Sequence, residues 1–116
     1  MDRRGDRRTP IWVTEVGWAT GGLPSPFRTS EAGQAARLNR AFRALIAARG
    51  RLRLRRVIVF GLQDRPYRSD ATRWWGPRVG LFGIAGHPKP AWRTFVGFTG
   101  GRAGGRLPRV TARGRG

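Results

Sequence analysis

The stretch Ile11-Trp12-Val13-Thr14-Glu15-Val16, followed directly by Gly17-Trp18, decides the fold of this chain. It predicts a short strand with Ile11, Val13 and Glu15 on one face and the other three side chains on the opposite face. Both faces are largely apolar, which is typical of a parallel strand covered on each side. A carboxylate at the end of a buried strand is costly unless it has a partner or a function. Glu15 is therefore the first candidate functional residue.

The rest of the sequence predicts one β-α-β unit and a final helix. Thr29 or Ser30 can cap a helix that runs to about Arg49, with Gly50 as its stop. Residues 56–63 form a second apolar run, so the two strands should lie parallel across the helix. After a long loop over 64–88, residues 90–98 predict a short closing helix that begins with proline. The predicted fold class is therefore α/β, in β-α-β-α order.

Two carboxylates follow the two predicted strands. Glu15 lies at the end of the first and Asp64 directly after the second, so parallel strands would bring both to one rim of the sheet. The loops of that rim also contain Trp18, Trp74 and Trp75. Indole faces stack on sugar rings, and carboxylates bind hydroxyls or react at the anomeric carbon. The rim is therefore a candidate carbohydrate site, whereas Trp12 and Trp92 are interpreted as packing residues.

The motifs, taken in order, resemble the retaining glycoside hydrolases of the (β/α)8-barrel clan that includes cellulase-like and xylosidase-like enzymes. The segment 10–18 resembles their seventh strand, whose Glu is the nucleophile, and 57–64 resembles the eighth strand with its terminal Asp. Trp75-Gly76, Gly80-Leu81-Phe82, Gly86 and Pro88-Lys89-Pro90-Ala91-Trp92 resemble the closing signature. The resemblance covers about residues 9–101. It implies a partial TIM barrel, the last two βα units, with Glu15 as nucleophile and Trp18, Asp64, Trp74 and Trp75 as sugar-binding residues.

One part of the family pattern is absent from this chain. The family's acid/base Glu follows an Asn at the end of strand four, which would precede these 116 residues. A complete barrel needs about 250 residues, and retaining chemistry needs a second carboxyl group about 5 Å from the nucleophile. The chain alone is therefore expected not to hydrolyse glycosides. Its expected partners are a carbohydrate and the missing N-terminal part of the barrel, and no cofactor is implied.

The charge of the chain leaves a second hypothesis open. The net charge is +18, and Lys89 is the only lysine among 24 basic residues. A small Arg-rich nucleic-acid-binding protein would have this charge, and the tail over 100–106 resembles RNA-binding Gly-Arg segments. GC-rich coding would also favour arginine together with alanine, glycine and proline. A nucleic acid is expected to bind through non-specific charge only.

Several classes of site and segment are excluded or disfavoured. There is no cysteine, so thiolate metal sites and disulfides are excluded, and the single histidine, His87, has no partner motif for a metal or a triad. No apolar run approaches the roughly 20 residues of a membrane helix. The expected organisation is a charged, disordered lead over 1–8, a partial barrel over 9–98 and a disordered Gly/Arg-rich tail over 99–116. A gene fragment without a stable fold is a third possibility, because a two-stranded sheet has open edges.

Overall fold

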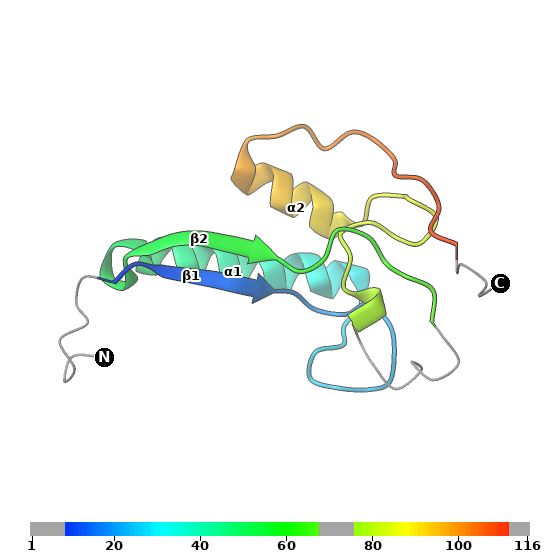
Figure 1. Cartoon of the computed structure of the whole chain (residues 1–116), viewed down its shortest axis with the longest axis horizontal. Helices are drawn as coiled ribbons and strands as arrows, with labels where there is room; N and C mark the ends of the chain where they lie inside the picture. Colours follow the sequence, from blue (N-terminus) through cyan, green and yellow to red (C-terminus); the bar gives the residue numbers. More distant parts are fainter. Residues whose placement is uncertain (1–8, 68–75, 112–116) are drawn as a thin grey trace.

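The computed structural model describes residues 9–67 and 76–111. Strands and helices alternate along them: β1 (Ile11–Val16), α1 (Glu31–Leu52), β2 (Leu54–Val59), the short 3-10 helix η2 (Gly76–Arg78) and α2 (Pro90–Thr99) (Figure 1). The two strands pair in parallel in a sheet that does not close. This confirms the predicted α/β class and the β-α-β-α order.

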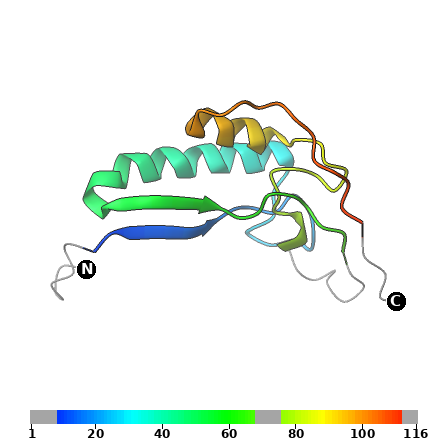
Figure 2. The ribbon, with the colours of Figure 1, turned by 45° about the horizontal axis from the view of Figure 1, so that its top comes forward.

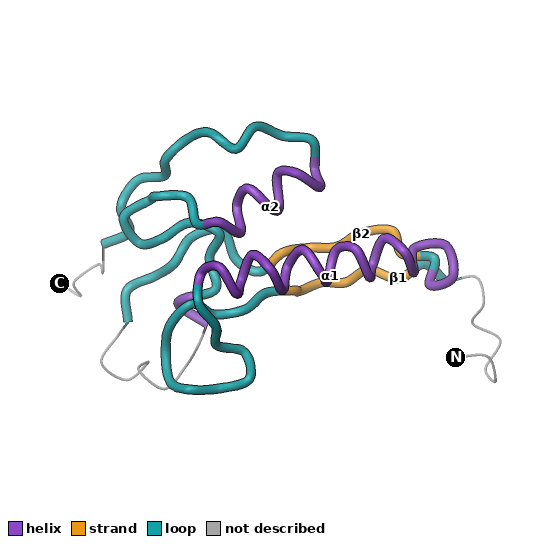
Figure 3. The backbone as a smooth tube through the Cα atoms, turned by 180° about the vertical axis from the view of Figure 1, so that it is seen from behind, coloured by secondary structure: helices purple, strands orange, loops and turns teal. Residues whose placement is uncertain are grey.

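The two-stranded sheet is covered by a helix on one face only. Helix α1 runs along one face of the sheet, and α2 packs beside the N-terminal half of α1 (Figures 2 and 3). No described element covers the opposite face of the sheet, where Trp12 is 54% exposed and Ile58 is 48% exposed. The guanidinium of Arg56 lies 4.9 Å from the centre of the Trp12 ring. Trp12, expected to be a packing residue, therefore lies half in solvent beneath an arginine.

The core lies where α1, α2 and the loop before α2 meet. Phe42 of α1 packs edge-on against Phe98, with ring centres 5.0 Å apart, and lies 6.3 Å from Phe95. Trp92 stacks on Phe95 and tilts against Phe82. These aromatic contacts join two helices that are far apart in sequence. They also confirm Trp92 as a packing residue.

Helix α1 begins as predicted and ends later than predicted. The Ser30 side chain accepts a hydrogen bond from the Gly33 backbone N–H at 3.0 Å, which is the expected N-terminal cap. The helix does not stop at Gly50, because the residue with left-handed backbone geometry is Arg53, at φ 50°. The N–H of Arg53 bonds to the Gly50 carbonyl 3.1 Å away, so arginine occupies a position that glycine usually fills.

The second strand lies earlier in the sequence than predicted. β2 ends at Val59, and the Phe60 backbone N–H still donates to the Val16 carbonyl of β1, whereas residues 61–63 pair with the segment before α2. The backbone N–H groups of Leu81 and Phe82 donate to the carbonyls of Gly61 and Leu62. The contacts of this second segment are made by the backbone, and the Leu62 side chain is 59% exposed. A continuous apolar run could not distinguish the two arrangements.

The segment over 101–111 has neither helix nor strand, and it contacts the loop before α2. Leu107 packs against the core, and its N–H donates to the Gly86 carbonyl at 2.9 Å. The N–H of Val110 donates to the Ile84 carbonyl, and the Gln63 amide donates to the Pro108 carbonyl at 2.7 Å. A side chain at Gly86 would collide with the Leu107 carbonyl, so this close approach needs glycine.

Candidate functional site

The carboxyl ends of both strands point to the same end of the molecule, where the long loops gather (Figure 1). The register of β1 against β2 shifts between Val13 and Val16, so the predicted strict alternation is wrong at this point. Thr14 and Glu15 are both exposed, while Val16 packs against the core. Such a bulge redirects side chains at a strand end. It leaves Glu15 exposed just before the chain leaves the sheet.

Glu15 has a free carboxylate as far as residues 9–67 and 76–111 are concerned. Within these ranges the Glu15 carboxylate forms no hydrogen bond and no ion pair. Directly after it, the backbone of Gly17 passes so close to the Phe60 carbonyl oxygen that any side chain at position 17 would collide with it. Gly17 therefore lets the ends of the two strands approach each other behind Glu15.

Asp64 lies in a different environment from Glu15. It is 3% exposed and forms an ion pair with Lys89, which is 1% exposed, with Lys89 Nζ 2.7 Å from Asp64 Oδ2 and 2.9 Å from Oδ1. The Gly80 backbone N–H donates to Oδ1 at 2.9 Å, and Lys89 Nζ also donates to the Thr20 hydroxyl at 2.8 Å. The pair therefore joins the loop after β1, the loop after β2 and the start of α2.

Burial shifts the pKa of Asp64 and the pKa of Lys89 in opposite directions, each toward the neutral form of its side chain. Loss of hydration raises the pKa of Asp64, more than the hydrogen bonds from Lys89 and Gly80 and the charge of Lys89 lower it. Loss of hydration likewise lowers the pKa of Lys89, although Asp64 opposes the change. Both shifts favour the neutral forms. The pair is therefore a costly structural element that fixes geometry.

A cleft of about 390 Å³ opens beside this ion pair. Its polar lining includes Asp64, Tyr67, Arg78, Glu31 and His87. The Arg78 guanidinium lies 4.5 Å from the centre of the Tyr67 ring. His87 Nε2 lies 3.9 Å from a Glu31 carboxylate oxygen, and both side chains are about half exposed. The cleft thus combines an aromatic ring with groups that donate and accept hydrogen bonds.

Glu15 does not line this cleft. Parallel pairing brings the two strand ends together, as expected, but the two carboxylates have different surroundings. Glu15 is exposed and Asp64 is bound to Lys89. A role for Asp64 in sugar binding stays a prediction. A sugar in the cleft would meet Asp64 as a carboxylate that is already paired with Lys89.

The tryptophans predicted for the sugar site fall into two groups. Trp18 is partly buried and packs against the core, and its carbonyl accepts a hydrogen bond from the Gln34 side chain at 2.9 Å. Trp74 and Trp75 lie outside the described residues. Their predicted roles as sugar platforms stay predictions.

Two buried polar residues were missed by sequence reasoning as site residues. Gln34 is 3% exposed, and its amide nitrogen donates to the carbonyls of Trp18, Val79 and Gly80, which ties α1 to both loops. Periodicity gives no signal for it, because a glutamine on a helix is usually solvated. Lys89 did carry a signal. It is the only lysine in a chain whose other cations are all arginine.

Comparison of the chain with protein-family models, with curated proteins and with solved structures finds no match in any of the three. Within the described ranges, no group of three histidine or acidic side chains could hold a metal ion. No helix among the same residues is both long and apolar enough to cross a bilayer.

Proposed function

We propose that this chain forms the last two βα units of a retaining glycoside hydrolase barrel that cleaves O-glycosidic bonds, with Glu15 as the nucleophile. The observation that carries the proposal is the free, exposed carboxylate of Glu15 at the carboxyl end of a parallel strand. Catalytic groups of (β/α)8 barrels lie at this end of their strands.

The proposed reaction has two steps. The Glu15 carboxylate attacks the anomeric carbon, forming a glycosyl ester, while an acid outside this chain protonates the departing glycosidic oxygen. Water then attacks the same carbon, gives its proton to that second group and releases Glu15. In this reaction the ion pair of Asp64 and Lys89 keeps the loops around the rim in place.

The incompleteness of the sheet also supports the proposal. Both outer edges of the two-stranded sheet lack a partner strand within residues 9–67 and 76–111, and one face is bare. In a closed barrel, neighbouring strands would pair with both edges and interior side chains would cover that face. The exposed Trp12 and Ile58 would then be interior residues.

The proposal is tested by covalent trapping of the nucleophile in the full chain. A panel of 2,4-dinitrophenyl 2-deoxy-2-fluoroglycosides is suitable, because the good leaving group needs no acid and the fluorine slows release of the glycosyl-enzyme. We expect peptide mass spectrometry to locate the sugar on Glu15 and the Glu15→Gln variant to stay unlabelled. Hydrolysis of unactivated glycosides should be absent in both.

The matched control is Glu31→Gln, which removes another solvent-accessible carboxylate near the same end of the molecule. This variant should label as fast as the parent chain. Labelling of Glu31 at the rate of Glu15, or no labelling of Glu15 by any sugar of the panel, would contradict its role as nucleophile.

A further inference from the structure

Two polar groups on the wall of the cleft beside Asp64 are buried without a hydrogen-bond partner. They are the Tyr67 hydroxyl and Nε of Arg78, and neither has a partner among residues 9–67 and 76–111. Buried polar atoms in folded proteins nearly always have a partner, so each exception calls for an explanation. The hydroxyl can donate a hydrogen bond, and the arginine nitrogen can only donate. This wall of the cleft therefore offers two donors to an acceptor.

The surrounding backbone holds the two donors in place. The Arg78 carbonyl, at the end of η2, accepts hydrogen bonds from the backbone N–H and the hydroxyl of Thr20, at 2.9 and 3.2 Å. The Arg78 guanidinium lies over the Tyr67 ring, and a side chain at Gly21 would come within 3.1 Å of both the Tyr67 hydroxyl and Cγ of Arg78. Donors that are positioned before a ligand arrives lose less freedom when it binds.

Among the described residues, Arg78 is the cation of this cleft that has no acidic partner. Asp64 neutralises Lys89 in the buried pair, and Glu31 lies 3.9 Å from His87. Glu31 is also about half exposed, so water and salt screen its repulsion of an anion. A planar guanidinium matches two oxygens of a carboxylate or a sulfate. An anionic group at this wall would therefore meet both the charge and the donors.

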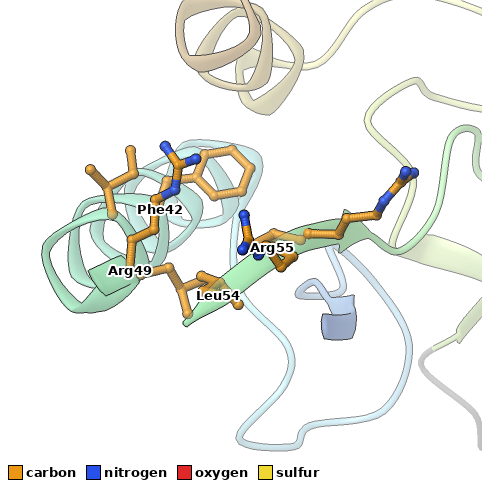
Figure 4. Close-up of a pocket in the computed structure, with 8 residues that line it drawn as sticks. Phe42, Arg49, Leu54 and Arg55 are labelled. Carbon is orange, nitrogen blue, oxygen red and sulfur yellow. The ribbon is translucent and has the colours of Figure 1, made fainter. Parts of the chain in front are cut away.

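A second hollow, between α1 and β2, contrasts with the cleft (Figure 4). It has a volume of about 130 Å³, and Phe42 and Leu54 are among its apolar lining residues. Its two labelled arginines, Arg49 and Arg55, are exposed, and no residue of its lining has a buried polar atom without a partner in the described ranges. The cleft beside Asp64 is thus the hollow whose chemistry indicates a ligand.

We propose that Arg78 and Tyr67 bind an anionic substituent, a carboxylate or a sulfate ester, on the sugar that occupies this cleft. The guanidinium donates to two oxygens of the substituent, and the Tyr67 hydroxyl donates to one of them. The cleft volume of about 390 Å³ is within the usual range for small-molecule sites. The inference rests on the proposed function and names its substrate class, the acidic glycans.

The test is a titration of the full chain with methyl glycosides at physiological salt, followed by proton–nitrogen NMR, in which arginine Nε–H groups give their own signals. The acidic probes are the methyl uronides and the methyl glycosides sulfated on the primary hydroxyl, in gluco and galacto configuration. The neutral methyl glycosides are the controls. We expect an acidic sugar to bind about tenfold or more tightly than its neutral counterpart, because a charge-assisted contact is added. Tighter binding of the uronide or of the sulfated sugar identifies the substituent.

The NMR signals and two variants locate the binding site. The Arg78 Nε–H signal, identified by its loss in Arg78→Lys, should shift when an acidic sugar binds. Arg78→Gln should abolish the preference for acidic sugars, whereas Arg40→Gln, which removes the same charge from an exposed position of α1, should keep it.

Tyr67→Phe keeps the test valid if Arg78→Gln disturbs the loops. It removes only the hydroxyl and should weaken binding of the acidic sugar about fivefold. Because this hydroxyl has no partner in the described part of the chain, the same variant should not lower the free energy of unfolding. A purely structural tyrosine would show the opposite pattern, with stability lost and affinity kept.

Three results would overturn the inference. The first is equal binding of acidic and neutral sugars. The second is an equal loss of affinity in Arg78→Gln and Arg40→Gln, which would show attraction by net charge alone. The third is binding of acetate or inorganic sulfate as tight as that of the acidic sugars, which would show a site for small anions only.

Failure of this inference and failure of the proposed function are distinguishable. Glu15 does not line the cleft, so Glu15→Gln should bind acidic sugars as tightly as the parent chain. Binding of acidic sugars without labelling of Glu15 would support the anion site and contradict the nucleophile. Labelling of Glu15 by neutral fluoroglycosides as fast as by their uronic acid counterparts would support the nucleophile and overturn the acidic substrate.

Discussion

Asp64 and Lys89 show at the scale of single residues how this small molecule holds its loops. Their charges are almost completely buried, and burial shifts the pKa of each toward its neutral form. An ion pair in such surroundings contributes little net stability, whereas removal of one partner leaves a buried charge without compensation. The pair therefore acts by fixing where three segments meet.

Removal of one partner should cost more than removal of both charges. Lys89→Met should lower the free energy of unfolding by about 3–5 kcal/mol at neutral pH, as measured by urea unfolding. The double variant Asp64→Asn/Lys89→Met should recover most of this loss, because the asparagine oxygen can still accept from the Gly80 N–H. A double variant that loses as much free energy of unfolding as the two single variants together would contradict the inference that the buried pair is costly.

The loss in Lys89→Met should also depend on pH. Without Lys89, burial alone raises the folded-state pKa of Asp64 above its unfolded value of 3.8. A raised folded pKa gives stability that is complete below the unfolded pKa and is lost as the pH rises through the folded pKa. The deficit relative to the parent chain should therefore be small near pH 3 and large near pH 7. A stability deficit that grows on acidification would contradict a raised pKa of Asp64 in the folded variant.

At the scale of elements, the sequence predicted the kinds of structure better than their ends. The start of α1 and both bounds of β1 follow from Ser30 and from the apolar stretch 11–16. The end of α1 did not, because Arg53 adopts left-handed geometry that intrinsic preference assigns to glycine. Contacts such as those of Gln34 and Lys89 join residues from distant loops, and no local pattern encodes them.

Arg53, the left-handed residue at the end of α1, predicts that glycine changes the free energy of unfolding in opposite directions at positions 53 and 51. Arg53→Gly should raise the free energy of unfolding by up to about 1 kcal/mol, because glycine adopts this geometry without strain. Arg51→Gly, inside the last turn of the same helix, should lower it by about 1 kcal/mol. Thermal or urea unfolding measures both, and a loss of stability in Arg53→Gly would contradict the explanation.

At the scale of the whole molecule, an uncovered apolar face is combined with a high net charge. Trp12, Ile58 and Leu62 are each about half exposed, and the chain carries +18 charges. Apolar patches favour association, while a large net charge opposes it. The balance between these effects should therefore depend on ionic strength.

Added salt should promote self-association of the purified chain. Screening removes repulsion between copies and leaves the apolar attraction, so the average mass in sedimentation velocity should rise from low to high salt. Ile58→Lys should reduce the effect, whereas Arg40→Lys, which keeps the charge at an exposed helix position, should not. An average mass that falls with added salt would instead indicate association through ion pairs.

Because Lys89 is both the only lysine and almost completely inaccessible, the chain contains its own chemical reporter of opening. A reagent that acylates amines can modify two places, the α-amino group and this single ε-amino group. The second reacts only in molecules whose loops have separated. The rate at which a second acyl group appears in the intact mass spectrum therefore measures how often this junction opens, with no engineered label.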